Sequence, residues 1–222
     1  MEIKGAIFDM DGTLVDSLAF WGEFWHEFGI KYMECDNYFP PEQVNNAIKT
    51  MVYSQGVKYI YKACALAVSE AEFVEFSEYM IENFYTTRAT VKKGAIELLD
   101  YLKSLGIPMC VASATDLKYV KVAIKSTGLE KYFDTVLSCE QVGKGKDSPE
   151  IYLAAAKEIG SEISDTCVFE DSCVALETAR KAGFKTVGVY DKYNFGHDRL
   201  RTAAMLYVDD GQSLATLIND IK

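Results

Sequence analysis

The chain has 222 residues, of which 49% are hydrophobic and 25% are charged, and its 33 acidic against 23 basic residues give a net charge of −10. This length and composition are ordinary for a soluble protein with a sizeable core, built either as one large α/β domain or as a core with a smaller insert. The acidic balance, without a basic stripe, argues against nucleic acid or an anionic membrane surface as a partner.

Nothing in the sequence marks an export or membrane segment. No apolar run approaches the ~18 residues of a membrane span, and the N-terminus lacks the basic start and long apolar stretch of a signal peptide. The six cysteines form no C-x-x-C pair, and Cys110 and Cys167 fall in apolar strand-like runs, where a free cysteine acts as a small hydrophobe. We therefore expect a cytoplasmic protein in a reducing compartment, without disulfides.

The sequence argues against a site built on histidines. Only two histidines are present, too few for a zinc cluster or a His-based triad. His26 lies in an aromatic-rich predicted helix and His197 in a predicted polar loop, and both are expected to be structural or solvated.

The first predicted strand, residues 3–8, ends directly in two carboxylates, Asp9 and Asp11, within the sequence Asp-Met-Asp-Gly-Thr. A buried parallel strand is a short continuous apolar run, and α/β proteins bind ligands at the carboxyl edge of the sheet. The two acids repel each other unless a cation lies between them, and carboxylate oxygens suit Mg²⁺. The alternative is a solvated Asp-rich turn. A Ca²⁺ loop fits less well, because Gly12 follows Asp11 too soon and no Glu stands at the closing position.

Residues 16–88 follow with helical periodicity only. A stripe of large aromatic residues recurs at helical spacing over 20–28, and Gly29 is expected to end that helix. Pro40-Pro41 opens the next segment, and a capping box at Ser69 begins a helix that runs to about residue 85. We expect a small helical bundle whose core holds the aromatic stripe; the alternative is that the stripe lines a ligand site.

From about residue 92 strands and helices alternate. Helices are predicted at 94–104, 116–126, 149–160 and from about 172 to 182, and strands at 109–112, 135–138, 166–169, 186–190 and 205–208. Regular alternation of this kind predicts a doubly wound, Rossmann-like parallel sheet with right-handed crossovers. The predicted domains are therefore an α/β core, 1–15 and 89–222, and a helical cap, 16–88, that hangs over the edge where Asp9 lies.

Polar side chains follow four strands or strand-proximal loops and are expected to converge on one edge of the sheet. They are Asp9 with Asp11, Ser113-Ala114-Thr115, Lys146, and Glu170 with Asp171. Each has a simpler reading when taken alone. Ser113 could be a neighbour of a helix cap, Lys146 a solvated loop lysine, and Glu170-Asp171-Ser172 the cap of the next helix.

This ordered set resembles the haloacid dehalogenase-like phosphatase superfamily, and the helical insert resembles its subclass with an α-helical cap. The resemblance covers essentially the whole chain. It is nearest to the β-phosphoglucomutase-like branch, through the sequences Ala-Ser-Ala at 112–114, Lys-x-x-Pro at 146–149 and Glu-Asp-Ser at 170–172.

The resemblance implies a mechanism and a role for each site residue. Asp9 would be the nucleophile that forms an aspartyl-phosphate, and Asp11 the general acid and base. Mg²⁺ would be held by the Asp9 carboxylate, the Asp11 backbone carbonyl and Asp171, with Glu170 assisting. The residues implied to bind the phosphate are Ser113, Ala114 and Lys146. The cap would close over the site, with hinges near 15–17 and 87–91.

The chain departs from the mutases of that branch. They carry a His just after the first motif and a basic phosphate anchor in the cap. This chain has Phe20 and Trp21 around the first of these places. Lys49 and Lys58 are candidate replacements for the anchor, although a solvated lysine is the simpler interpretation of each. The sequence therefore favours a Mg²⁺-dependent phosphatase of a small phosphorylated metabolite, acting as a monomer or weak homo-oligomer. A sugar phosphomutase and a non-catalytic phospho-receiver are the alternatives. The aromatic cap suggests a substrate with an apolar or stacking face.

Overall fold

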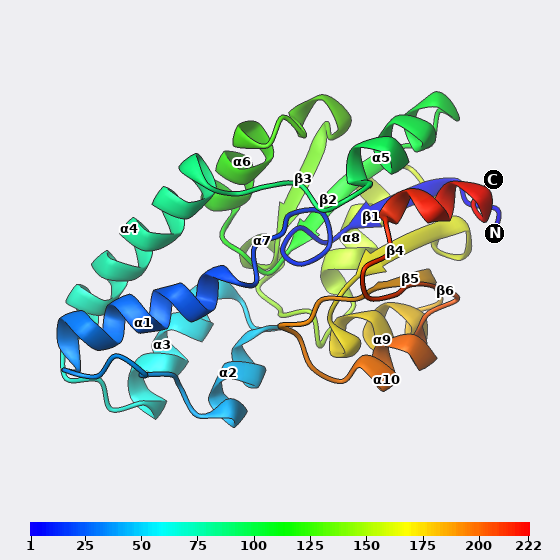
Figure 1. The fold of residues 1–222 in the computed structure, drawn as a ribbon. Coiled ribbons are helices and arrows are strands. Elements are labelled where there is room, and N and C mark those ends of the chain that lie inside the picture. The colour runs from blue at the N-terminus through cyan, green and yellow to red at the C-terminus, as the bar shows by residue number, and fades with distance from the viewer.

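The computed structural model describes residues 1–222 as a six-stranded parallel sheet with a helical body beyond one end of it (Figure 1). The strands are β1 (Gly5–Phe8), β2 (Met109–Ser113), β3 (Thr135–Ser138), β4 (Thr166–Glu170), β5 (Lys185–Val189) and β6 (Leu206–Val208). Their order in the sheet is β3-β2-β1-β4-β5-β6, and every neighbouring pair is parallel. The predicted doubly wound, Rossmann-like fold is confirmed, with β1 at the centre of the sheet.

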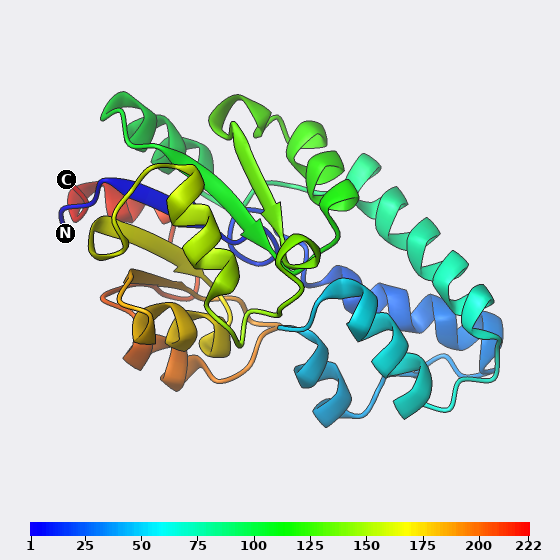
Figure 2. The same ribbon diagram turned by 180° about the vertical axis from the view of Figure 1, so that it is seen from behind.

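Helices cover both faces of this sheet, as the two opposite views in Figures 1 and 2 show. The helices of the sheet domain are α5 (Ala95–Ser104), α6 (Leu117–Ser126), α7 (Cys139–Val142), α8 (Glu150–Glu158), α9 (Cys173–Lys181) and α10 (His197–Ala203), with 3-10 turns η1 (Glu130–Tyr132), η2 (Ile163–Asp165) and η3 (Leu214–Asn219). Alternate residues of β1 point to opposite faces of the sheet. Ala6 and Phe8 belong to the hydrophobic core on the side of α5 and α6, and Ile7 belongs to the hydrophobic core on the side of α8 and α9. This period of two is the reason that a strand buried on both sides is a continuous apolar run.

The insertion between β1 and β2 forms the cap. Its helices are α1 (Phe20–Tyr32), α2 (Glu42–Ile48), α3 (Tyr53–Ala63) and α4 (Glu70–Thr87), and α5 completes the connection to β2. Phe24, Trp25 and Phe28 of the aromatic stripe are at most 1% exposed, so most of the stripe is core, as expected. The predicted capping box at the start of α4 is present, with the Ser69 hydroxyl accepting the N–H of Glu72 and the Glu72 carboxylate accepting the N–H of Ser69.

Some predicted helix boundaries were wrong. Gly29 does not end α1, which continues to Tyr32. A Cβ at Gly29 would lie 2.2 Å from the Cys35 carbonyl oxygen, so the glycine instead lets the following loop fold back on the helix. His197 does not lie in a loop but opens α10, with its ring 4.5 Å from that of Tyr190. The helix expected from residue 149 begins at Glu150, without a side-chain cap.

Two chain segments connect the cap to the sheet domain, and they run side by side. Val15 forms an antiparallel bridge with Val91, the Asp16 N–H donates to the Thr90 carbonyl at 2.9 Å, and the Lys92 N–H donates to the Leu14 carbonyl at 2.8 Å. We place the predicted hinges, and the predicted boundary between the core (1–15 and 89–222) and the cap (16–88), at this paired connection.

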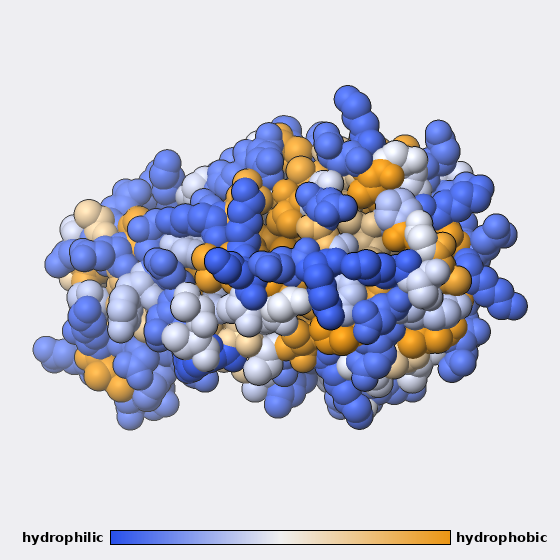
Figure 3. Space-filling view, turned by 90° about the horizontal axis from the view of Figure 1, so that it is seen from above, coloured by the Kyte–Doolittle hydropathy of each residue, from blue (hydrophilic) through white to orange (hydrophobic).

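The surface seen from above in Figure 3 is mainly hydrophilic, with hydrophobic residues in small groups between the charged ones. Large hydrophobic side chains that are more than half exposed are few and scattered, among them Ile30, Tyr79 and Met205. None of the helices combines the length and the apolar character needed to cross a membrane.

Candidate active site

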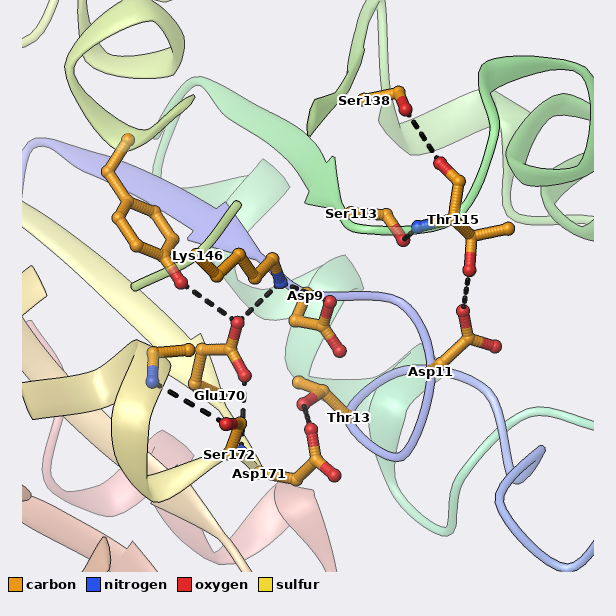
Figure 4. Close-up of polar contacts among 12 residues, drawn as sticks. Asp9, Asp11, Thr13, Ser113, Thr115, Ser138, Lys146, Glu170, Asp171 and Ser172 are labelled. Atoms are coloured by element: carbon orange, nitrogen blue, oxygen red, sulfur yellow. Dashed lines mark hydrogen bonds and ion pairs between the residues drawn. The ribbon is translucent and has the colours of Figure 1, made fainter. Parts of the chain in front are cut away.

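All seven predicted site residues line one cavity of about 380 Å³ between the carboxyl edge of the sheet and the cap. They are Asp9 and Asp11 after β1, Ser113 and Ala114 at the end of β2, Lys146 before α8, and Glu170 and Asp171 at the end of β4. Figure 4 shows the side chains of six of them, all but Ala114, converging from these separate segments. The topology explains the convergence, because β2, β1 and β4 are neighbours in the sheet and end at the same edge.

The turn after β1 needs its glycine. The Asp9 N–H donates to the Phe169 carbonyl at 3.0 Å, which continues the pairing of β1 with β4 up to the acid. Gly12 then adopts φ +86°, a conformation that residues with a side chain rarely take, and a Cβ there would lie 2.4 Å from Asp171 Oδ2. The close approach of the two loops therefore depends on the absence of a side chain at residue 12.

Lys146 lies at the centre of the buried charges. Its Nζ donates to Asp9 Oδ1 and to Glu170 Oε1, and its side chain is only 3% exposed. Glu170 also accepts hydrogen bonds from the Tyr152 hydroxyl at 3.0 Å and from the Ser172 N–H at 3.2 Å. The alternative interpretation of Lys146 as a solvated loop lysine was wrong, because the side chain is buried.

The acidic groups fit a divalent cation. Carboxylate oxygens of Asp9, Glu170 and Asp171 lie within 4.8 Å of one another, and all three residues are buried. Burial, and then the neighbouring carboxylates, hold the pKa of Asp9 well above its usual range despite the Lys146 ammonium. Burial and Glu170 likewise raise the pKa of Asp171. One ammonium does not balance three carboxylates, and hard oxygen ligands of this kind are those that Mg²⁺ prefers.

Asp11 stands apart from this acidic group. Its carboxylate accepts three hydrogen bonds, from the hydroxyls of Ser17 at 2.6 Å, Tyr85 at 2.7 Å and Thr115 at 2.8 Å. Figure 4 shows Asp11 with Thr115, away from Lys146. The Asp11 carboxylate is thus held by three hydroxyl groups. Of the atoms of Asp11, only the backbone carbonyl oxygen is predicted to bind a metal.

The sequence also allowed Ser113 to be only a neighbour of a helix cap and residues 170–172 to be only the cap of the next helix. Both interpretations hold only in part. Ser113 is 1% exposed and its Oγ accepts the Thr115 N–H at 3.1 Å, whereas Asp116 caps α6. Ser172 does cap α9, through the Ala175 N–H. Glu170 and Asp171 instead face the buried lysine and the turn after β1.

Asn194 was not found from the sequence, and the contacts that Thr13 and Lys49 make in the site were not expected from it. Asn194, in the loop after β5, donates through Nδ2 to Asp171 Oδ2 at 2.7 Å, and Thr13 Oγ1 donates to Asp171 Oδ1 at 3.3 Å. Lys49 of the cap donates to Asn194 Oδ1 at 3.2 Å and to the Tyr193 carbonyl at 2.8 Å, and burial lowers its pKa. The available signal for Asn194 was its place in the loop after the carboxyl end of a predicted strand, the one that forms β5. Lys58, the other candidate anchor, is exposed.

Comparisons with known proteins agree on a family. A family model described as haloacid dehalogenase-like hydrolase matches residues 3–183. The phosphorylated carbohydrates phosphatase of Thermotoga maritima is 27% identical over 218 residues, 97% of this chain and 98% of the relative. Hexitol phosphatase A of Escherichia coli is 28% identical over 189 residues, 85% and 84% of the two chains.

Solved structures show the same fold. The β-phosphoglucomutase of Clostridium difficile superposes with a TM-score of 0.73 at 22% identity, covering 97% of this chain and 93% of the other. CbbY of Rhodobacter sphaeroides in complex with phosphate superposes with a TM-score of 0.78 at 20% identity, covering 97% and 96%.

Proposed function

Because the chain belongs to the haloacid dehalogenase-like hydrolases and is a phosphatase of that family, we propose that it hydrolyses a small phosphorylated metabolite with Mg²⁺, through an aspartyl-phosphate on Asp9. The observation that carries this proposal is the buried group of Asp9, Lys146, Glu170 and Asp171 at the base of a cavity that the cap covers. A structural ion pair alone would not need two further carboxylates beside the one that Lys146 neutralises.

In the first step the Asp9 carboxylate attacks phosphorus, and the bond from phosphorus to the leaving oxygen breaks. A carboxylate that approaches a phosphate dianion meets a repulsion of roughly 4 kcal/mol per charge pair at 4 Å in a surface-like dielectric. The Lys146 ammonium offsets part of that repulsion. Asp9, Glu170 and Asp171, with the backbone carbonyl of Asp11, would hold Mg²⁺, which supplies further positive charge against the phosphate.

Proton transfer is assigned to Asp11, whose carboxylate lies outside the buried acidic group. It protonates the leaving oxygen and later takes a proton from the water that attacks phosphorus, which regenerates Asp9. Ser113 and the N–H of Ala114 are assigned to the phosphate oxygens. The cap would exclude water during the first transfer, so that phosphate passes to Asp9 alone.

The named activities of two relatives support an alcohol ester as substrate. One relative is named for phosphorylated carbohydrates and the other for hexitol phosphates. Since the chain carries a net charge of −10, its attraction for such an anion must come from local groups such as Lys146.

A sugar phosphomutase with the same aspartyl-phosphate is the second candidate, and one observation favours it. Lys49 lies in the cavity wall, where a second phosphate could meet its ammonium. That ammonium already donates to Tyr193 and Asn194. The phospho-receiver is not retained, because the chain matches a hydrolase family and carries the cap.

The test is release of inorganic phosphate from a panel of phosphorylated metabolites, with and without Mg²⁺. Mg²⁺-dependent release by the native enzyme, absent from a folded Asp9→Asn variant, supports the phosphatase. Isomerised sugar phosphate without net phosphate release supports the mutase instead. Residual turnover above a few per cent in a verified, undeamidated Asp9→Asn variant contradicts the assignment of Asp9.

A further inference from the structure

The cavity above Asp9 changes its chemical character from the sheet to the cap. The sheet end is lined by the charged and polar residues of the site. The cap end is lined mainly by apolar side chains, among them Trp21, Trp25, Phe39, Ile60, Phe73 and Ile81. A molecule whose phosphate lies beside Asp9 therefore places its leaving group against this apolar wall.

Two of the four polar side chains at the cap end of the cavity are already engaged in hydrogen bonds within the protein. The polar side chains of the cap end are Asn45, Lys49, Tyr53 and Ser77. Lys49 already donates to two oxygens of the 193–194 loop, and the Ser77 hydroxyl donates to the Phe73 carbonyl at 2.7 Å. An open polyol, with a hydroxyl on every carbon, would leave most of its hydroxyls unpaired there.

Trp25 supplies a second, independent observation. Its indole belongs to the cavity wall and is fully buried, and Nε1 has no hydrogen-bond partner. The aromatic rings around it are those of Phe24, Phe28, Tyr38, Phe39 and Phe73, and the hydroxyl of Tyr38, the one acceptor among them, does not pair with Nε1. Buried donors in native proteins are nearly always paired, so the missing acceptor points to a group that a molecule in the cavity brings with it once the cap side chains around Nε1 make room.

We propose that the substrate is a phosphate monoester of a ring-bearing alcohol, whose aromatic or heteroaromatic ring fills the cap end and presents an acceptor atom to Trp25 Nε1. This inference rests on the proposed function, since it takes the phosphate to lie beside Asp9. Hydrolysis breaks the bond between phosphorus and the alcohol oxygen, consumes one water, and releases inorganic phosphate and the ring alcohol.

A binding measurement tests the proposal without turnover. Trp21 and Trp25 are the only tryptophans of the chain and both line the cavity, so tryptophan fluorescence reports its occupation directly. The Asp9→Asn variant is titrated, with Mg²⁺ present, with benzyl phosphate, the three pyridylmethyl phosphates and a hexitol 6-phosphate, all esters of primary alcohols. We expect the ring esters to bind about tenfold more tightly than the hexitol ester, and one pyridylmethyl isomer more tightly than benzyl phosphate. Equal or tighter binding of the hexitol ester overturns the proposal.

Trp25→Phe tests the acceptor, because it keeps a ring and removes the indole N–H. In the Asp9→Asn background it should abolish the preference for the pyridylmethyl isomer and leave benzyl phosphate affinity within about twofold. Trp21→Phe is the matched control and should keep the preference. An unchanged preference in Trp25→Phe overturns the pairing with Nε1.

A second variant keeps the test independent of how well Trp25→Phe folds. Val57→Asn adds an amide to a half-buried position of the apolar wall, and should lower the ratio of ring-ester to hexitol-ester affinity by about tenfold. An unchanged ratio in this variant means that the leaving group does not contact the wall.

Turnover of the same esters by the native enzyme separates the two proposals. Tight binding of the ring esters without phosphate release from any ester contradicts the phosphatase assignment and leaves the ring site standing. Faster hydrolysis and tighter binding of the hexitol ester leaves the phosphatase standing and overturns the ring site.

Discussion

Asp11 is held by hydroxyl groups from three different parts of the chain. Ser17 comes from the first connection to the cap, Tyr85 from the end of α4, and Thr115 from the loop after β2. The orientation of this carboxylate therefore depends on how the cap lies on the sheet domain. Burial, and then the Asp11 charge, keep the pKa of Tyr85 well above its usual range, so its hydroxyl remains a donor throughout the physiological range.

The Tyr85→Phe variant should lower kcat by about tenfold with little change in melting temperature, because Asp11 loses one of its three positioning hydrogen bonds. Steady-state kinetics and circular dichroism melts measure both effects. Tyr79→Phe, at a side chain that is 67% exposed, is the control and should behave as the native enzyme. An unchanged kcat in Tyr85→Phe would mean that the hydroxyl does not orient Asp11.

Cys110, the second residue of β2, is expected to make the protein sensitive to alkali. Burial raises the pKa of its thiol to about 12, whereas an exposed thiol has a pKa near 9. Between these pH values the unfolded chain releases a proton that the folded chain keeps. The contribution of the Cys110 thiol to the free energy of unfolding is therefore fully present below pH ~9. It is lost as the pH rises above that value, by up to ~1.4 kcal/mol per pH unit.

Urea unfolding between pH 8 and 11 measures this dependence. The free energy of unfolding should fall less steeply with pH in Cys110→Ala than in the native protein, by about one proton's contribution. Cys35 is exposed, so Cys35→Ala should keep the native slope. Identical slopes in all three proteins would contradict the role of the buried thiol.

Among single residues, the acids, Ser113 and Lys146 could be predicted, because each follows a strand or a motif that the sequence displays directly. Tyr85 and Asn194 could not. Tyr85 is separated from Asp11 by 74 residues, and its contact depends on the packing of α4 against the sheet domain. Asn194 stands in a loop with no motif, and only the strand order brings it to Asp171.

Among the elements, the loop before α8 holds the cap against the sheet domain. The Lys146 N–H donates to the Thr50 carbonyl of the cap at 2.8 Å, and a Cβ at Gly145 would lie 2.2 Å from that same oxygen. Glycine at 145 is thus required by the closeness of the two backbones, and this contact also fixes the residue that carries the central ammonium.

The Gly145→Ala variant should lower kcat/KM by about tenfold, because the cap must shift away from the loop while the sheet domain keeps its packing. Kinetics on the best panel substrate, with a thermal melt of the same sample, checks this. Lys144→Ala changes an exposed neighbour in the same loop and should leave kcat/KM intact. An unchanged kcat/KM in Gly145→Ala would show that catalysis does not need the close contact between this loop and the Thr50 carbonyl.

Element types were predictable where local signals agree with the tertiary structure. The capping box of α4 and the apolar runs of the strands are such cases. The end of α1 was not, because Gly29 serves a contact with the Cys35 carbonyl rather than a helix stop. Nor was α10, a short helix in a polar segment whose first residue packs on Tyr190.

For the protein as a whole, the buried acidic group of Asp9, Glu170 and Asp171 opposes folding unless a cation balances its charge. A cation that binds only the folded chain stabilises it by mass action, by ~2.7 kcal/mol at a hundredfold excess over Kd. For a chain of this size that corresponds to a rise in melting temperature of about 5–10 °C.

Thermal melts with and without Mg²⁺ measure this effect. The native protein should gain about 5–10 °C, while Asp171→Asn should gain nothing and melt higher than the native protein when both lack Mg²⁺. Asp134→Asn, at an exposed position of the sheet domain, should keep the native response. A full Mg²⁺ response in Asp171→Asn would contradict the assigned metal site.

Phosphate is expected to pass through Asp9, and this intermediate can be trapped. The enzyme is acid-quenched during turnover of its best substrate and digested, and the peptide that contains Asp9 and Asp11 is sequenced by mass spectrometry. We predict the added mass of one phosphoryl group on Asp9, and none in the Asp9→Asn variant. A phosphoryl group on another residue, or turnover with no phosphorylated peptide at any quench time, would rule out Asp9 as the nucleophile.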